Sequence, residues 1–404
     1  MDRLILVVNV GSTSFKYQLL KMPGMDCLSR GKVDRVFSGQ AEFFWQNQNG
    51  KKHSMLLDAR SGYEPCISQM LTILTQGSGK VMASLEEIAA VGFKTVMAGP
   101  LNRTVKVTPQ VYEQMEKYNF VAPAHNPPYI AAMKAFEEVM PNVPLVAAFE
   151  TSFHKQIPEE RTVYAFPKEL REKYGLRKYG FHGASHSYIS WIVPQILGVQ
   201  NNPKIISCHL GGSSSISAIQ DGHSVDTSMG FSPQAGLPNN NRNGDIDVFA
   251  VLYLMEQENL SPVQMRQILS TDSGLKGISG ISGDVRDLKS SSEPEANLAL
   301  NHLVYSAKRY IGSFAAEMNG VDIVTFSGGI GENDPQTRAA ICESMDYLGI
   351  KLDEEKNENL CGQIDGVGQV ISADDSRVKV IVVPTNEELM VAMRVEQVLE
   401  EEER

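Results

Sequence analysis

Three segments of the chain combine glycine and serine residues in a pattern that could bind phosphate groups. They are residues 11–14 (GSTS), 211–215 (GGSSS) and 327–331 (SGGIG), and each directly follows an apolar run. Small residues let backbone N–H groups approach phosphate oxygens, and serine hydroxyls add further donors. One such turn usually only reverses the chain, but three of them favour phosphate binding. None fits the P-loop pattern, and the third also fails G-x-G-x-x-G, which disfavours a dinucleotide fold.

Three single residues have charged or titratable side chains in settings that could suit a ligand. His182 lies in GFHGASH, where neighbouring glycines permit a ligand to approach closely. Arg242, in NRNGDID, offers a planar fork of donors that suits an anion, although it could instead form a surface ion pair with Asp245 or Asp247. Glu387 begins the last expected helix, where an acidic side chain can interact with the dipole of the helix N-terminus.

The elements that would position these residues alternate between strands and helices. Buried-strand patterns at residues 4–10 and 204–209 each enter a Gly/Ser turn and continue as a second strand. This echo suggests two related halves but is too weak to establish a duplication. The layout indicates an α/β fold with ligand-binding loops at strand ends. Further strands are expected at residues 15–20, 90–96, 144–149, 216–219, 322–326 and 379–383, and helices at 129–139, 300–317 and 387–402, the last capped by Thr385 or Asn386.

The composition is that of a globular protein that can bury a sizeable core. The 404 residues are 42% hydrophobic and carry a formal net charge of -11, which argues against nucleic acid and anionic membranes as partners. Five scattered cysteines without a CxxC pair are typical of reduced thiols in the cytoplasm. The first apolar run has the pattern of a strand rather than a signal peptide, and no run approaches the ~18 residues of a membrane span.

Ten segments together resemble the acetate kinase family. They follow the family's order and spacing from residue 5 to about 393, and they are NVGSTSFKYQLL, HNPP, FETSFHKQIP, KYGFHGASH, CHLGGSSSISAI, GHSVDTSMGFSP, RNGDID, SGLKGISGISGDVRDL, FSGGIGEN and VPTNEEL. The resemblance implies an α/β fold of two ribonuclease H-like domains, shared with sugar kinases and actin, with the active site in the interdomain cleft. It also implies Mg²⁺ or Mn²⁺, ATP and ADP as co-substrates, a short-chain carboxylate converted reversibly to an acyl phosphate, and a homodimer.

The resemblance carries domain bounds and residue roles to this chain. The N-terminal domain is expected at residues 1–150, completed by residues 385–404, and the C-terminal nucleotide-binding and dimerisation domain at residues 151–384. The implied catalytic residues are His182, Arg242, Lys94 and Glu150, and the metal residues are Asn9 and Glu387. Nucleotide binding is implied for Ser12, Ser14, Lys16, His209, Gly211, Gly212, Asp284, Val285, Arg286, Gly329, Ile330 and Asn333. Substrate binding is implied for Lys94, Val96, Ala124, His125, Phe181 and Pro233.

The chain departs from the family pattern mainly where the acceptor should bind. In GFKTVMAGP, Phe93, Lys94 and Met97 replace a histidine, a catalytic arginine and a second histidine. Glu150 replaces an aspartate, and on the nucleotide side Gly212 replaces an asparagine. Lysine offers a mobile point charge where arginine offers a bidentate fork.

These changes leave three readings of the function open. The enzyme could remain an acetate kinase, it could use another acceptor, or its kinase activity could be weak or lost, leaving a nucleotide-binding sensor or scaffold. Ala124 replaces a leucine and should leave extra room, so the sequence predicts an acceptor larger than acetate. A sugar kinase is disfavoured because the matching motifs belong to carboxylate kinases.

Overall fold

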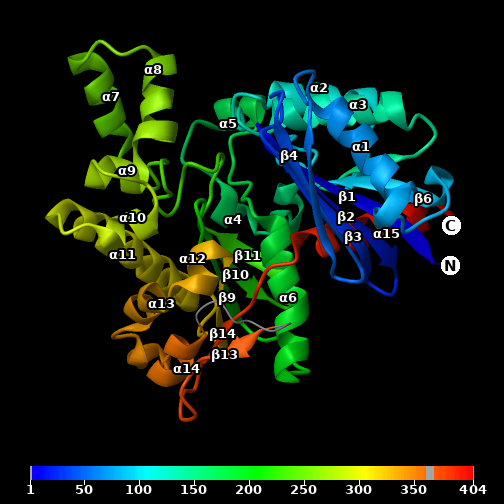
Figure 1. The fold of residues 1–404 in the computed structure, drawn as a ribbon. Coiled ribbons are helices and arrows are strands. Elements are labelled where there is room, and N and C mark those ends of the chain that lie inside the picture. Colours follow the sequence, from blue (N-terminus) through cyan, green and yellow to red (C-terminus); the bar gives the residue numbers. More distant parts are fainter. Residues whose placement is uncertain (1, 361–367, 404) are drawn as a thin grey trace. The chain divides into compact units, whose positions relative to one another are not determined.

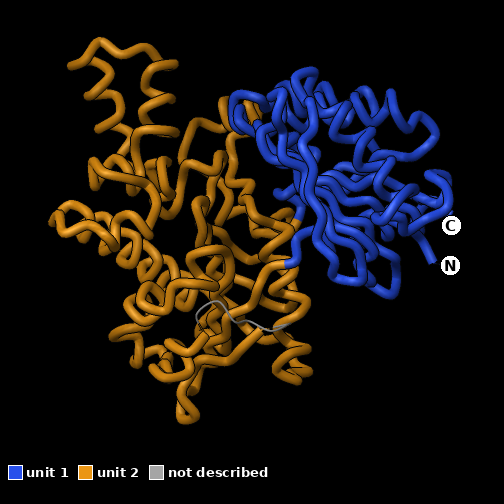
Figure 2. The backbone as a smooth tube through the Cα atoms, in the orientation of Figure 1, with its two compact units in different colours: residues 1–152, 386–404 blue, residues 153–385 orange. Residues whose placement is uncertain are grey.

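Two compact units make up the chain. The computed structural model describes residues 2–360 and 368–403. Unit 1 comprises Met1–Ser152 together with Asn386–Arg404, and unit 2 comprises Phe153–Thr385 (Figure 2). The chain therefore leaves unit 1, builds the whole of unit 2 and returns to complete unit 1 with its last helix.

A sheet that includes β1 to β4 and β6 forms the centre of unit 1 (Figure 1). It has eight strands in the order β5-β4-β3-β2-β1-β6-β8-β7. β1 pairs with β2 in antiparallel register and with β6 in parallel register. The hairpin at residues 11–14 thus joins two neighbouring strands, as its Gly/Ser sequence predicts. The strands are β1 (Arg3–Val10), β2 (Ser14–Met22), β3 (Asp26–Asp34), β4 (Ala41–Asn47), β5 (Lys52–Leu57), β6 (Ile88–Phe93), β7 (Val105–Lys106) and β8 (Leu145–Ala147).

Helices cover both faces of this sheet. On one face, α1 (Tyr63–Thr75), α2 (Pro109–Lys117) and α3 (Asn126–Val139) share a core with alternate residues of the strands, among them Leu6 and Val91. On the other face lies α15 (Glu387–Glu403), which contacts β1, β2 and β6. Gly92 permits this contact, because a Cβ there would lie 2.7 Å from a methyl group of Val395. The side chain of Asn386 accepts a hydrogen bond from the backbone of Leu389, as expected of the predicted cap.

A six-stranded sheet forms the centre of unit 2, in the order β11-β10-β9-β12-β14-β13. β9 pairs with β10 in antiparallel register and with β12 in parallel register. The strands are β9 (Ile205–His209), β10 (Ser215–Gln220), β11 (His223–Thr227), β12 (Ile323–Ser327), β13 (Gln369–Val370) and β14 (Lys379–Val382).

Two long helices pack on this second sheet. α11 (Pro294–Glu317) shares the core that contains Ile206, Cys208 and Val324, whereas α6 (Gly183–Leu197) reaches β9 with a side chain that meets Ser207, on the opposite side of the strand. Shorter helices fill the rest of unit 2: α4 (Glu159–Thr162), α5 (Lys168–Tyr174), α7 (Val248–Gln257), α8 (Pro262–Gln267), α9 (Gly274–Ser279), α10 (Val285–Ser290), α12 (Gly328–Asn333), α13 (Pro335–Cys342) and α14 (Glu354–Asn359).

Two local expectations need correction. The strand expected at residues 90–96 ends at Phe93, because Thr95 N–H donates to the Phe93 carbonyl at 2.9 Å and turns the chain. The third Gly-rich segment is not a loop but the short helix α12, in which Ile330 N–H and Gly331 N–H both donate to the Leu210 carbonyl. None of the described helices is both long and apolar enough to span a membrane.

Candidate functional site

A half-buried ion pair lies at the end of β6 in unit 1. The Lys94 ammonium contacts the carboxylate of Glu387, the first residue of α15, and each of the two side chains is 15% exposed. Burial opposes charging of Lys94, but the carboxylates of Glu387 and Glu150 outweigh it and raise the pKa of Lys94. Lys94 is therefore charged, and it neutralises Glu387, the residue for which the family resemblance implied a role in metal binding.

Four further polar side chains lie near this pair. Tyr129, on α3, donates a hydrogen bond of 3.0 Å to Asn9 Oδ1 at the end of β1, and burial raises the pKa of this tyrosine. Glu150 is 4% exposed, and its backbone N–H donates to the Thr95 carbonyl, which holds it beside the Lys94 segment. The Arg394 guanidinium, on α15, donates to Ser152 Oγ at 3.1 Å. Burial lowers the pKa of Arg394, and the Glu150 carboxylate opposes that shift.

This cluster fits a metal ion that is carried mainly by a nucleotide. Asn9 and Glu387 offer one amide and one carboxylate oxygen, which are the hard ligands that Mg²⁺ and Mn²⁺ prefer. No group of three or more histidine, cysteine or acidic side chains suited to a metal occurs in the described part of the chain. Mg²⁺ commonly binds through one or two protein oxygens, substrate phosphates and water, so these two residues suffice for a metal–nucleotide complex but not for a protein-only site.

Four histidines gather in unit 2, where α6 meets β9 and β10. His182 immediately precedes α6, and its ring lies 4.4 Å from that of His209. His182 Nδ1 and His186 Nε2 both contact Ser215 Oγ at 2.8 Å. The ring of His154 lies 5.9 Å from that of His186, and its Nε2 donates to the Phe181 carbonyl. The sequence singled out His182 and His209 but not the two buried histidines behind them.

Arg242 has the surroundings of an anion-binding arginine. Its guanidinium donates to the Pro233 carbonyl at 3.2 Å, and burial lowers its pKa. Within the described ranges it forms no ion pair with a carboxylate. Asp245 instead meets Arg309 and Tyr310, and Asp247 caps α7, so the alternative of a surface ion pair with either is not realised. A partly desolvated arginine with donors to spare favours an anionic ligand.

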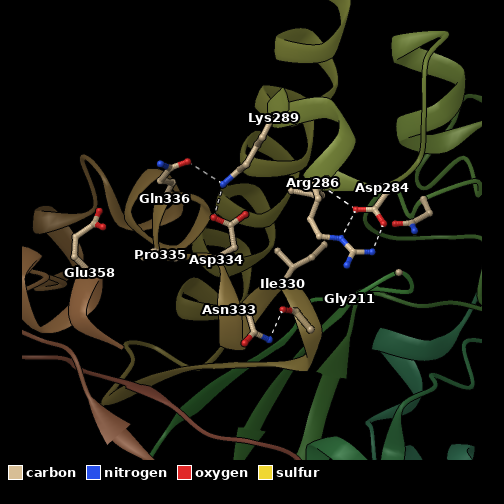
Figure 3. Close-up of a pocket in the computed structure, with 14 residues that line it drawn as sticks. Gly211, Asp284, Arg286, Lys289, Ile330, Asn333, Asp334, Pro335, Gln336 and Glu358 are labelled. Carbon is tan, nitrogen blue, oxygen red and sulfur yellow. Dashed lines mark hydrogen bonds and ion pairs between the residues drawn. The ribbon is translucent and has the colours of Figure 1, made fainter. Parts of the chain in front are cut away.

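A pocket of about 770 Å³ lies at the carboxyl end of β9 and beside α12 (Figure 3). Its volume is within the range of small-molecule sites. Figure 3 shows Arg286 turned toward Asp284 and Lys289 turned toward Asp334 and Gln336. The Arg286 guanidinium holds the pKa of Asp284 at about 2. A Cβ on Gly329 would meet nothing within 4 Å, so backbone is open to a ligand at this point.

Eight of the residues predicted to bind nucleotide line this one pocket. They are Gly211, Gly212, Asp284, Val285, Arg286, Gly329, Ile330 and Asn333. The pocket brings together three segments separated by more than forty residues of sequence, which the sequence alone could not place side by side. The four others lie elsewhere: Ser12, Ser14 and Lys16 are in unit 1, on and before β2, and His209 ends β9 with its Nδ1 bonded to Ser185 Oγ.

Six lining residues were not predicted from the sequence. They are Asn240, Lys289, Asp334, Pro335, Gln336 and Glu358. Lys289 lies one helical turn after Arg286 on α10, and Asp334 directly follows Asn333, so proximity to predicted residues was an available signal. In the sequence, Asn240 and Glu358 do not lie near any residue predicted to bind nucleotide, so no such signal was available for them. A Cβ on Gly212 would lie 3.3 Å from Asn240 Nδ2, so an amide lies beside the position where the family pattern has an asparagine.

The residues predicted to bind the acceptor are divided between the units. Val96, Ala124 and His125 belong to unit 1, where Ala124 is exposed and the other two are half-buried. Phe181 and Pro233 belong to unit 2 and are buried. Their joint role therefore stays a prediction.

Comparisons with known proteins agree with the motifs. The sequence pattern of the acetokinase family matches residues 4–393. An acetate kinase from Clostridium acetobutylicum is 41% identical over 393 residues, which is 96% of each chain. The crystal structure of Porphyromonas gingivalis acetate kinase matches with a TM-score of 0.87 at 36% identity, covering 98% of this chain and 100% of that one. A propionate kinase from Francisella tularensis matches with a TM-score of 0.86 at 31% identity, covering 97% and 98%.

The expected fold class is confirmed by these structures, since two of them share at least 31% identity and nearly the full length of the chain. The match over residues 4–393 leaves only the two ends outside the family pattern. With 41% identity to a curated relative as well, the chain belongs to the acetokinase family.

Proposed function

We propose that this acetokinase-family enzyme transfers the γ-phosphoryl group of ATP to a short-chain carboxylate, reversibly, giving an acyl phosphate and ADP. The observation that supports this most is the 770 Å³ pocket of unit 2, because eight predicted nucleotide residues from three segments line it. Glycine backbone, the Lys289 ammonium and the Arg286 guanidinium give this pocket donors for phosphate oxygens.

The chemistry needs charge neutralisation more than proton transfer. A carboxylate oxygen bonds to the γ-phosphorus while the bond to the β-phosphate oxygen breaks and ADP leaves. Since the acceptor is already an anion, no general base is required, and the protein must position the groups and neutralise their charge. Arg242 would donate to the phosphoryl oxygens, and Lys94 would neutralise the acceptor. A bound Mg²⁺ or Mn²⁺, held by Asn9 and Glu387, would supply further neutralisation of the phosphates.

The test is a screen for ADP release over short carboxylates, hydroxy acids and amino acids, followed by hydroxamate trapping of the product. A trapped hydroxamate with stoichiometric ADP supports the proposal. Nucleotide binding should also raise the melting temperature, because a ligand that binds only the native state stabilises it. If nucleotide binds but no carboxylate is phosphorylated, the second candidate, a nucleotide-binding sensor or scaffold, is correct. The contact of Lys94 with Glu387 favours that candidate, since it occupies a residue that metal would need.

We infer further that the preferred acceptor is larger than acetate. Ala124 stands where the family pattern has a leucine, which would leave more room at the proposed acceptor site, and Phe93 and Met97 are apolar where the pattern has histidines. One methylene in an apolar pocket changes specificity by roughly 10–200-fold. The comparison of kcat/KM for acetate, propionate and butyrate, in the wild type and in Ala124→Leu, decides the question. The variant should move preference back toward acetate, and a wild type that strongly prefers acetate would refute the inference.

The enzyme is also proposed to form a homodimer through α7. This helix has the sequence VFAVLYLMEQ, yet none of its residues is buried, and Phe249 is 74% exposed. Apolar patches of this kind on a soluble surface usually mark an interface, and a two-fold dimer covers the same face on both copies. Light scattering should show that Phe249→Glu gives monomers. Tyr347→Glu, at a similarly exposed aromatic residue of unit 2, is the control and should remain dimeric.

A further inference from the structure

A continuous chain of side-chain hydrogen bonds runs inward from His182. His182 Nδ1 contacts Ser215 Oγ at 2.8 Å, Ser215 Oγ contacts His186 Nε2 at 2.8 Å, and His186 Nδ1 contacts Ser207 Oγ at 2.9 Å. The last three of these four residues are completely buried. His182 itself is half-buried at the start of α6, so the chain joins a predicted catalytic histidine to the interior of unit 2.

The number of hydrogens in this chain limits how it can be arranged. Each hydroxyl carries one hydrogen, and each neutral imidazole carries one N–H that can be on either nitrogen. Ser215 therefore donates to one of its two histidines and accepts from the other. Burial lowers the pKa of His186, with help from His154 and His209, so His186 is neutral and contributes only one hydrogen. Two arrangements remain, and they run in opposite directions.

In the first arrangement, each hydrogen of the three buried residues has an acceptor within the chain. Ser207 O–H donates to His186 Nδ1, His186 Nε2–H donates to Ser215, and Ser215 O–H donates to His182 Nδ1. The hydrogen of His182 is then on Nε2. With Nδ1 accepting from Ser215, the hydrogen on Nε2 is the one that His182 can donate to a phosphoryl oxygen.

In the second arrangement, His182 carries its hydrogen on Nδ1, and His186 donates from Nδ1 to Ser207. The hydroxyl hydrogen of Ser207 would then need another acceptor. Across residues 2–360 and 368–403, the only hydrogen-bond partner of the Ser207 side chain is His186. A buried hydroxyl without an acceptor gives up its hydrogen bond to water and gains none in return, which costs free energy. The second arrangement is therefore disfavoured.

We propose that Ser207, His186 and Ser215 act as positioning residues that hold His182 as the Nε2–H tautomer, so that it donates a hydrogen bond to the phosphoryl group during transfer. The role of His182 in transfer rests on the function proposed above. The tautomer itself does not, because it follows from the hydrogen count of the buried chain.

The first experiment needs no variant. Nitrogen NMR of the full-length protein labelled with ¹⁵N-histidine distinguishes the protonated from the unprotonated nitrogen of each ring, and the His182 signals are assigned by their loss in His182→Ala. At neutral pH we expect His182 protonated on Nε2 and His186 neutral and also protonated on Nε2. A wild-type His182 protonated on Nδ1, or a charged His186, would overturn the proposal.

The second experiment removes the link. Ser215→Ala should leave His182 as a mixture of tautomers and lower kcat by ~10–100-fold, the scale for losing a partner that orients a functional histidine. The KM for nucleotide should stay unchanged. Ser215→Thr keeps the hydroxyl and should restore the tautomer and kcat. If Ser215→Ala does not fold, Ser215→Cys keeps the volume, replaces a strong donor by a weak one and decides the same question.

A matched control separates this chain from the rest of the histidine cluster. Ser224 Oγ contacts His154 Nδ1 at 2.8 Å, so Ser224→Ala breaks a buried serine–histidine bond of the same length outside the chain. It should change neither the His182 tautomer nor kcat. An equal effect of both alanine variants, or an unchanged tautomer in Ser215→Ala, refutes the proposal. If no carboxylate is phosphorylated at all, the function fails while the NMR result still decides the tautomer.

Discussion

Replacing Lys94 by methionine should destabilise unit 1 by a measurable amount, because it removes the ammonium that contacts Glu387 and faces Glu150. Two unit charges about 4 Å apart attract by about 4 kcal/mol at an effective dielectric constant near 20. Removing one partner of a buried pair costs roughly 3–5 kcal/mol. Lys94 and Glu387 each retain 15% exposure, so we expect a loss at the lower end, about 3 kcal/mol in the free energy of unfolding.

The chain offers a convenient probe for this measurement. It contains two tryptophans, Trp45 in β4 of unit 1 and Trp191 in α6 of unit 2. In a Trp191→Phe background, the fluorescence of Trp45, which packs partly on the core of unit 1, follows unfolding of that unit in urea. Lys94→Met, Glu387→Gln and the double variant then complete a double-mutant cycle, and Lys94→Arg is the control that keeps the charge.

The cycle should show coupling, because the second substitution removes the carboxylate that lost its lysine partner in the first one. We expect a coupling energy of about 1.5 kcal/mol or more, within the range for residues in contact. Strict additivity, or a loss below about 0.5 kcal/mol in Lys94→Met, would place the pair among exposed ion pairs of little value and would refute the reasoning.

Three further outcomes are expected. Arg242→Ala and His182→Ala should each lower kcat by at least ~100-fold with little change in nucleotide affinity; near-normal turnover in both would contradict their proposed roles. Asn240→Ala should weaken nucleotide binding by calorimetry roughly tenfold, about 1.5 kcal/mol for one hydrogen bond to a charged group, and an unchanged Kd would exclude the amide as a ligand. Burial and the Asp226 carboxylate raise the pKa of Glu317 from 4.5 to about 7. Between these two pH values the folded state holds a proton that the unfolded state has lost. The free energy of unfolding of unit 2, followed by its tryptophan fluorescence, should therefore fall as pH rises from about 4.5 through 7. Glu317→Gln should flatten this dependence on pH, and an equally steep dependence in the variant would assign it to another group.

Local pattern was enough to predict most elements that carry the site. The apolar runs before residues 11, 211 and 327 are the strands β1, β9 and β12, because a buried strand needs a continuous apolar segment whatever surrounds it. The strand at residues 90–96 was placed too far along the chain. Apolar residues resume at Val96 after Lys94 and Thr95, but the strand has already ended at Phe93, where Thr95 closes a turn.

The sequence by itself determined the family, the fold class and the chemical character of each motif. Strand periodicity, glycine-rich turns and residue types are all properties of short segments, so they can be recognised without knowing which segments meet. Only the tertiary structure decided which groups meet. Lys94 contacts Glu387, 293 residues away, and the Ser207 and Ser215 hydroxyls on two neighbouring strands meet the rings of α6. Such contacts depend on strand order, register and the face on which a helix packs. These are set by burial of the whole core, so no short segment of the sequence contains them.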